Sequence, residues 1–100
     1  MNSKTKLEPV HPGEILVSEF LEPMHLSQLQ LSKNINISLQ TINQICLGKR
    51  AITAGTSLLL GKYFGLSENF WLNLQNKFDL EVAKTEFQRK LKLVKRASAA

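Results

Sequence analysis

Two short helical segments, each opened by a serine and joined by a tight turn, constrain the fold of this chain more than any other feature. Ser27 is followed three residues later by Gln30, the spacing of a capping box, and apolar residues between positions 31 and 35 support about two turns of helix. Asn36 occupies the turn, where a left-handed residue is needed, and Ser38 opens the second segment. This order predicts a helix-turn-helix arrangement.

The second of these segments is amphipathic. Its apolar residues recur at helical spacing, so we expect them on the inner face: Leu39, Ile42, Ile45 and Cys46. Gly48 ends the helix. The outer face carries Gln40, Thr41, Asn43 and Gln44. Polar faces occur on most surface helices, so the functional interpretation of these four residues depends on what surrounds them.

Further helices are predicted on both sides of this unit. Pro12 suits the first position of a helix that Pro23 ends. Thr53 caps a fourth helix, which ends at Gly65. Gly61 falls inside this fourth helix, where a glycine should cost about 1 kcal/mol relative to alanine.

A fifth helix is predicted after Ser67, which we expect to cap it, with Glu68 in its first turn. Its apolar stripe consists of Phe70, Trp71, Leu74 and Phe78. The same spacing continues through Leu80, Ala83, Phe87, Leu91 and Val94, so the helix should run past Asp79. The sequence contains no strand-like alternation and no internal repeat.

The positive charge of the chain is unevenly distributed. The 100 residues carry a net charge of +5, yet residues 23–67 contain Lys33, Lys49, Arg50 and Lys62 and no acidic residue. Residues 88–100 hold five basic residues and no acid. A positive segment between acidic flanks suits a surface that faces a polyanion. The basic tail is a weaker signal, because such runs are usually solvated.

The helix-turn-helix pattern predicts a surface that reads DNA. With the inner face buried, the outer face of the helix after Ser38 can enter the major groove, where amides pair with adenine and threonine contacts a base edge or a thymine methyl. The start of the preceding helix suits a phosphate, as do the cations beyond Gly48. The predicted DNA-binding residues are Ser27, Gln28, Ser38, Gln40, Thr41, Asn43, Gln44, Lys49 and Arg50.

The motif residues also match a known pattern: Leu26-Ser27-Gln28, then Leu31 to Ser38, then Thr41-Ile42, Ile45, Gly48 and Arg50. Residues 26–53 therefore resemble the helix-turn-helix of the Xre/lambda-repressor-like superfamily. Asn36 stands where that family has its turn glycine, and His25 replaces a glycine after the first helix. Both residue types accept a left-handed conformation better than most.

A narrower resemblance covers residues 9–83. It is carried by His11-Pro12-Gly13-Glu14-Ile15-Leu16, Glu19 to Pro23, Ile52-Thr53-Ala54 and Phe70-Trp71-Leu72-Asn73-Leu74-Gln75. These strings are similar to those of HigA-type antitoxins of HigBA toxin–antitoxin modules. The resemblance implies a dimeric antitoxin that represses its own operon, binds double-stranded operator DNA and neutralises a small, ribosome-dependent mRNA-cleaving toxin.

Together, pattern and resemblance predict an all-α fold: a five-helix lambda-repressor-like helix-turn-helix domain with a C-terminal helical extension. We expect an extended or disordered N-terminus at 1–11, the helix-turn-helix domain at 12–83, and a basic tail, helical or disordered, at 84–100. No apolar run is long enough for a signal peptide or a membrane span, so we expect a cytoplasmic protein without a membrane partner.

Homodimerisation is expected because one helix-turn-helix unit touches few bases, so two copies are needed about 34 Å apart. The apolar face of the fifth helix is the candidate interface: Phe70, Trp71, Leu74 and Phe78, together with the later Phe87 and Leu91 stripe. The alternative for such a stripe is packing inside the core of one chain.

Other functions have less support. His11 and His25 flank the first helix without a ligand or catalytic partner at suitable spacing, and Cys46 is the only cysteine, so we expect no metal, no cofactor and no enzyme. Glu14, Glu19 and Glu22 fit a solvated face. The alternatives left open are a stand-alone transcriptional repressor and a protein-interaction module with little DNA binding. A membrane role for the tail and RNA binding are weaker.

Overall fold

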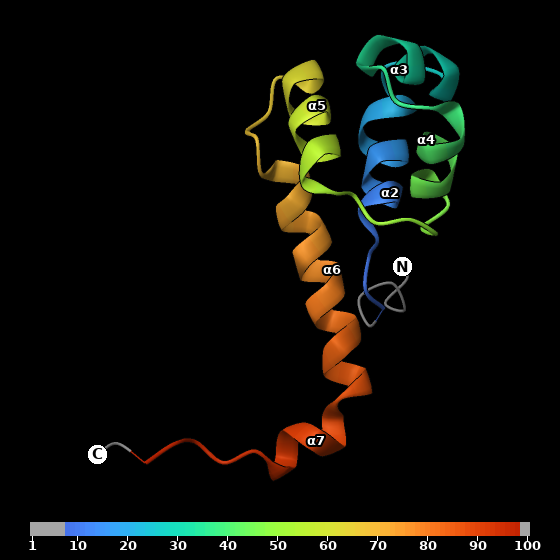
Figure 1. Cartoon of the computed structure of the whole chain (residues 1–100). Helices are drawn as coiled ribbons and strands as arrows, with labels where there is room; N and C mark the ends of the chain where they lie inside the picture. The colour runs from blue at the N-terminus through green and yellow to red at the C-terminus, as the bar shows by residue number, and fades with distance from the viewer. Residues whose placement is uncertain (1–7, 99–100) are drawn as a thin grey trace.

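The computed structural model describes residues 8–98, and this part of the chain is helical throughout, without a strand (Figure 1). In chain order its elements are α2 (Pro12–Ile15), the π-helix η1 (Leu16–Leu21), α3 (Gln28–Ile35), α4 (Leu39–Cys46), α5 (Ala54–Phe64), α6 (Phe70–Glu86) and α7 (Gln88–Leu93). The predicted all-α class and helix-turn-helix order are confirmed. The expectation for residues 1–7 lies outside the described residues.

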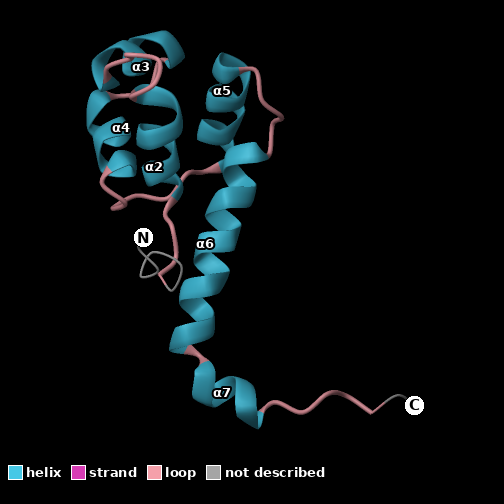
Figure 2. Cartoon of the chain, turned by 180° about the vertical axis from the view of Figure 1, so that it is seen from behind, coloured by secondary structure: helices cyan, strands magenta, loops and turns pink. Residues whose placement is uncertain are grey.

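The helical segments from α2 to α5 form a bundle from which α6 departs. α2 packs against α4 and α6, and α3 packs against both α4 and α5. α6 then runs away from the bundle and carries α7 at its far end, as both views show (Figures 1 and 2). α6 passes residues 83 and 84 without a break, and the boundary that we place there stays a prediction.

The core lies between these helices. Leu16, Ile42 and Ile45 have no exposed surface, so the inward positions predicted for Ile42 and Ile45 are confirmed. Trp71 is also fully buried, and its ring centroid lies 5.1 Å from that of Phe20. Burial of several large apolar side chains, each contributing about 1.5–3 kcal/mol, drives the association of these short helices.

The caps predicted from the sequence are largely confirmed. Ser27 Oγ accepts from the Gln30 amide at 3.0 Å while Ser27 N donates to Gln30 Oε1 at 2.9 Å, which completes the capping box. Ser38 and Thr53 cap α4 and α5. Asn36 is left-handed with φ of 59°. A side-chain oxygen therefore satisfies an otherwise free backbone amide at the start of each of these three helices.

The first helix has the predicted place but a different geometry. Pro12 is at its first position and it ends before Pro23, as expected. Between Leu16 and Leu21 it widens into a π-helix, with Glu22 N donating to Val17 O at 2.9 Å. The chain then turns through His25, which has φ of 52°, so the left-handed conformation expected there is present.

The predicted cap of the fifth helix is wrong. α6 begins at Phe70, and neither Ser67 nor its N-cap residue Asn69 caps it with a side chain. The cap comes from Ser57 on α5, whose Oγ accepts from Leu72 N at 3.1 Å and donates to Glu68 O at 2.7 Å. Glu68 therefore lies in the turn before α6, and a neighbouring helix supplies the missing hydrogen-bond partners.

The inward position predicted for Leu39 is also wrong, because this side chain is 43% exposed. On α5, Leu59 is 42% exposed, whereas Leu60 has no exposed surface. Gly61 lies on the face of α5 that packs against the turn before α6. A Cβ at this position would lie 2.7 Å from Ser67 O, so only glycine allows the helix and the turn to come this close. The expected stability cost of Gly61 is corrected accordingly, because alanine does not fit.

The C-terminal segments form an arm with an apolar stripe. α6 continues past Asp79 to Glu86, as predicted. Leu80, Phe87 and Leu91 are 62%, 47% and 56% exposed along the arm. Together with Ala83 and Lys84 they line a hollow of about 380 Å³. Within residues 8–98, no helix combines the length and apolar character needed to cross a bilayer.

Candidate nucleic-acid interface

The outer face of α4 is polar and accessible. Ile42 and Ile45 fix the orientation of this helix by pointing into the core with no exposed surface. On the other side Gln40 and Asn43 are exposed, and Thr41 is half-buried. The helix thus presents amide and hydroxyl groups outward from a rigidly packed backbone, which suits recognition of base edges.

The start of α3 lies beside this face. Gln28 Oε1 accepts a 3.2 Å hydrogen bond from Asn43 Nδ2, so the two helices of the motif are joined by a pair of predicted site residues. Ser27 Oγ already accepts from the Gln30 amide, which leaves its hydroxyl proton free to donate. The structure therefore brings the α3 start and α4 into one surface.

The loop after α4 adds the positive charge. Gly48 is left-handed with φ of 75°. Lys49 N donates a hydrogen bond of 2.8 Å to Gln44 O, and this turn ends the helix. Lys49 and Arg50 are exposed beyond this turn. Arg50 Nε donates to Gln44 Oε1 at 2.7 Å, so the loop is joined to the outer face of α4.

Ser38 and Thr41 are engaged locally. Ser38 Oγ accepts from Thr41 N at 3.1 Å and donates to Thr41 Oγ1 at 2.9 Å. The threonine hydroxyl keeps its own proton for a further partner, whereas the donor of Ser38 is used within the cap. Of the predicted site residues, Ser38 is thus the one whose structural role is strongest.

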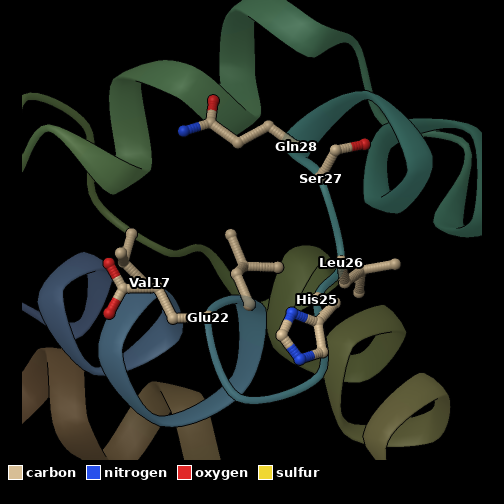
Figure 3. A pocket seen from close by; sticks show the side chains of 7 residues that line it. Val17, Glu22, His25, Leu26, Ser27 and Gln28 are labelled. Atoms are coloured by element: carbon tan, nitrogen blue, oxygen red, sulfur yellow. The ribbon is translucent and has the colours of Figure 1, made fainter.

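A hollow of about 570 Å³ adjoins the start of α3. Figure 3 shows Ser27 and Gln28 on one side of it and Val17 and Glu22 on the other, with His25 and Leu26 on the connecting segment. Glu22 is exposed, as are Glu14 and Glu19. The solvated face expected for these carboxylates is confirmed, but Glu22 also places an acidic group beside the candidate surface, which the sequence reasoning missed.

Leu39 is the second residue that the sequence reasoning missed. It occupies the first position of α4, next to Gln40, and is 43% exposed. Its spacing from Ile42 had suggested a core position. An exposed leucine among polar residues at the start of a recognition helix offers an apolar contact of the kind that a thymine methyl makes.

The candidate dimer face requires a correction. Trp71 has no exposed surface in a single chain, so it is core and unavailable to a partner. Phe70 and Leu74 pack against that core, and Phe78 lies edge-on to His11 with ring centroids 5.0 Å apart. Core packing, the alternative for this stripe, therefore holds for Trp71. Phe70, Leu74 and Phe78 are half-buried and stay a prediction for the dimer face, and further exposed apolar surface lies along the arm.

Among residues 8–98, the pKa values of Cys46 and His11 depart from their ordinary values. Burial raises the pKa of the Cys46 thiol, which fits the small apolar residue expected there. Burial lowers the pKa of His11, which caps α2 as the expected helix-end residue. Neither residue belongs to the predicted DNA-binding set.

Comparison with known proteins places this geometry in a family. Residues 17–71 match the helix-turn-helix family. Virulence-associated protein I of Dichelobacter nodosus is 44% identical over 85% of this chain and 79% of its own length. Antitoxin HigA-1 of Vibrio cholerae is 35% identical over 92% of this chain and 87% of its own length.

A solved structure agrees with this assignment. Pseudomonas aeruginosa antitoxin HigA, determined with the higBA promoter, is 34% identical and superposes with a TM-score of 0.85, covering 92% of this chain and 100% of that chain. The family match spans the whole motif from the π-helix to the start of α6. The chain therefore belongs to the helix-turn-helix family and, within it, to the HigA-type antitoxins.

Proposed function

We propose that this protein is a DNA-binding antitoxin that represses its own operon. The observation that carries the proposal is the single surface made by the start of α3, the outer face of α4 and the Lys49–Arg50 loop. Hydrogen bonds from Asn43 to Gln28 and from Arg50 to Gln44 join its parts. The promoter bound to the Pseudomonas aeruginosa relative supports the same use of this surface.

The side chains divide into two roles. Gln40 and Thr41 lie on the part of α4 that enters the major groove, where an amide pairs with adenine and a hydroxyl meets a base edge. Lys49 and Arg50 hold the phosphate backbone beyond the recognition helix. Ser27 and Gln28 add a phosphate contact at the start of α3, where the helix dipole favours an anion.

The partners follow from the family and the arm. Relatives named as antitoxins support neutralisation of a small mRNA-cleaving toxin, and a homodimer places two copies of α4 on successive turns of operator DNA. We assign the dimer contact to the exposed stripe of Leu80, Phe87 and Leu91 in place of Trp71. Residues 12–83 form the DNA-binding domain, and residues 84–100 form the tail.

A protein that represses a bacterial operon acts in the cytoplasm. Its role is to bind DNA and a partner protein, and it catalyses no reaction. His11 supports the second point, because its Nδ1 is used to accept from Gly13 N at 2.9 Å. The main rival is a protein-interaction module with little DNA binding. The two functions differ in whether double-stranded DNA binds to the outer face of α4.

The proposal is tested with a duplex covering the promoter of the protein's own gene and a scrambled duplex of equal length. Gln40→Ala should weaken promoter binding by about 1–3 kcal/mol, with a much smaller loss on scrambled DNA. Asn76→Ala, which removes an exposed amide from α6, serves as the control and should change neither. Equal losses on both duplexes would show that Gln40 does not read sequence. Absence of promoter binding by the unaltered protein would favour the interaction module.

A further inference from the structure

His11 occupies an unusual position for a histidine. It is the N-cap of α2 and only 5% exposed, and its Nδ1 accepts from the backbone N–H of Gly13 at 2.9 Å. Caps of this kind are usually serine, threonine, aspartate or asparagine. A short acceptor would satisfy the helix end equally well, so the cap alone does not explain the imidazole ring.

The rest of the ring contacts two other parts of the chain. The backbone of Arg50, in the loop after α4, lies beside the ring and favours its protonated form. Because Nδ1 accepts from Gly13, the ring proton of neutral His11 lies on Nε2, which is the nitrogen available to the Arg50 carbonyl. The edge of the ring also packs on Phe78 of α6, with centroids 5.0 Å apart.

The same loop is shaped around the histidine. A Cβ at Gly48 would lie 3.7 Å from the Cβ and Cγ of His11, so the loop runs beside the histidine with no more than about a methyl group's width between them. The side chain of Arg50 then turns outward to Gln44. His11 thus holds the backbone of a residue whose side chain belongs to the candidate DNA surface.

We propose that neutral His11 is a positioning residue for DNA binding, which fixes Arg50 and its loop from the start of α2 and from α6. The inference rests on the proposed function. His11 itself lies inside the protein and acts only through Arg50. Its ring length and its neutral tautomer are what the position requires, since one nitrogen must accept while the other donates.

Protonation would break this arrangement. A proton on Nδ1 turns the acceptor of the Gly13 N–H into a second donor, and the two N–H groups then oppose each other. Burial lowers the pKa of His11, while the Arg50 backbone and the carboxylates of Glu14 and Asp79 partly counter that effect. These are the charged and hydrogen-bonding groups that face the ring from α2, the loop and α6.

The direction of the pH effect follows. Burial places the folded pKa of His11 below its ordinary value of about 6.5, so the hydrogen bond from Gly13 N to Nδ1 is intact above that pH and is lost as the pH falls through the folded pKa. Promoter affinity should therefore decrease on acidification. His25 is exposed and lies outside this arrangement, so it provides a matched histidine control.

The test compares His11→Asn with His11→Gln and with His25→Asn as the control. Asparagine retains a cap acceptor but is too short to reach Arg50, whereas glutamine carries its amide N–H to the place of Nε2. We expect His11→Asn to stay folded, to bind the promoter duplex about tenfold more weakly at neutral pH and to lose the acid-dependent decrease. His11→Gln should recover part of the affinity without the pH dependence, and His25→Asn should keep that dependence.

Backbone NMR of the free protein provides the second measurement. The amides of Gly48 to Arg50 should shift with His11 protonation and in His11→Asn. Unchanged affinity and an unchanged pH profile in a folded His11→Asn would overturn the proposal, as would loop shifts without any change in affinity. If the unaltered protein binds no promoter DNA, the proposed function fails, and positioning for DNA binding fails with it. Loop shifts in that case would show that His11 still fixes the loop.

Discussion

Arg50 donates a hydrogen bond of 2.7 Å from its Nε to Oε1 of Gln44. The sequence assigned these residues separate tasks, phosphate binding for the arginine and base recognition for the glutamine. In the folded chain they form one unit, since the arginine occupies one lone pair of the amide oxygen and leaves the terminal guanidinium nitrogens free. Gln44 is thereby fixed in orientation, while Gln40 keeps both amide groups available.

This pairing predicts that the two cations of the loop differ. Lys49→Ala should weaken binding to promoter and scrambled duplexes alike and reduce the salt slope by about one unit. Arg50→Ala should reduce the slope similarly and also lower the preference for the promoter, because Gln44 loses its partner. Salt-dependent anisotropy titrations measure both quantities. Identical behaviour of the two variants would remove Gln44 from base recognition.

Gln75 should stabilise the fold through one buried hydrogen bond. It is 4% exposed, and its Oε1 accepts from the buried Ile52 N at 2.9 Å. Gln75→Leu leaves that amide without a partner, so we expect a loss of about 1–3 kcal/mol in the free energy of unfolding. Asn76→Leu alters the next, exposed position and should have little effect. Urea unfolding at one protein concentration measures the difference, and equal values for both variants would contradict the assignment.

Two glycines of the same helix should respond to alanine in opposite directions. A Cβ at Gly61 would lie 2.7 Å from Ser67 O, so Gly61→Ala must displace the turn before α6 and lower stability. Nothing lies within 4 Å of a Cβ at Gly55, where alanine should add about 0.4–1 kcal/mol. Thermal unfolding of both variants tests this pair. A stabilised Gly61→Ala would show that the turn moves without cost.

The arm predicts how the protein dimerises. Phe87→Asp combined with Leu91→Asp places charge in the exposed stripe, so it should yield a folded monomer with weak promoter binding. Gln88→Asp changes a polar neighbour and should remain dimeric. Sedimentation equilibrium distinguishes these states. A monomeric unaltered protein at tens of micromolar would rule out the stripe as a self-association surface.

Local signals predicted the helices, and contacts between distant segments produced the exceptions. Ser27, Ser38 and Thr53 cap helices within their own turn, so the sequence alone locates them. The cap of α6 comes from Ser57, which lies 15 residues before the amide that it satisfies. No local pattern contains that partner.

The candidate site shows the same division. The polar face of α4 follows from helical spacing, whereas the approach of His11 to the backbone of Arg50 depends on how α2 meets the far end of the motif. Trp71 illustrates the remaining ambiguity, since a helical stripe reveals amphipathicity but not whether its partner is the same chain or another.

Two side chains meet the segment between α4 and α5: Gln75 accepts a hydrogen bond from Ile52 N, and His11 lies beside the backbone of Arg50, where we propose a second anchor. Ordering a backbone costs roughly 1–2 kcal/mol of conformational entropy per residue. In this protein the loop is ordered when the chain folds. Binding of a ligand to the loop therefore requires little further ordering, and little affinity is lost. Both anchors lie against or within α6, and any change that loosens α6 would transfer the entropy loss to the binding step.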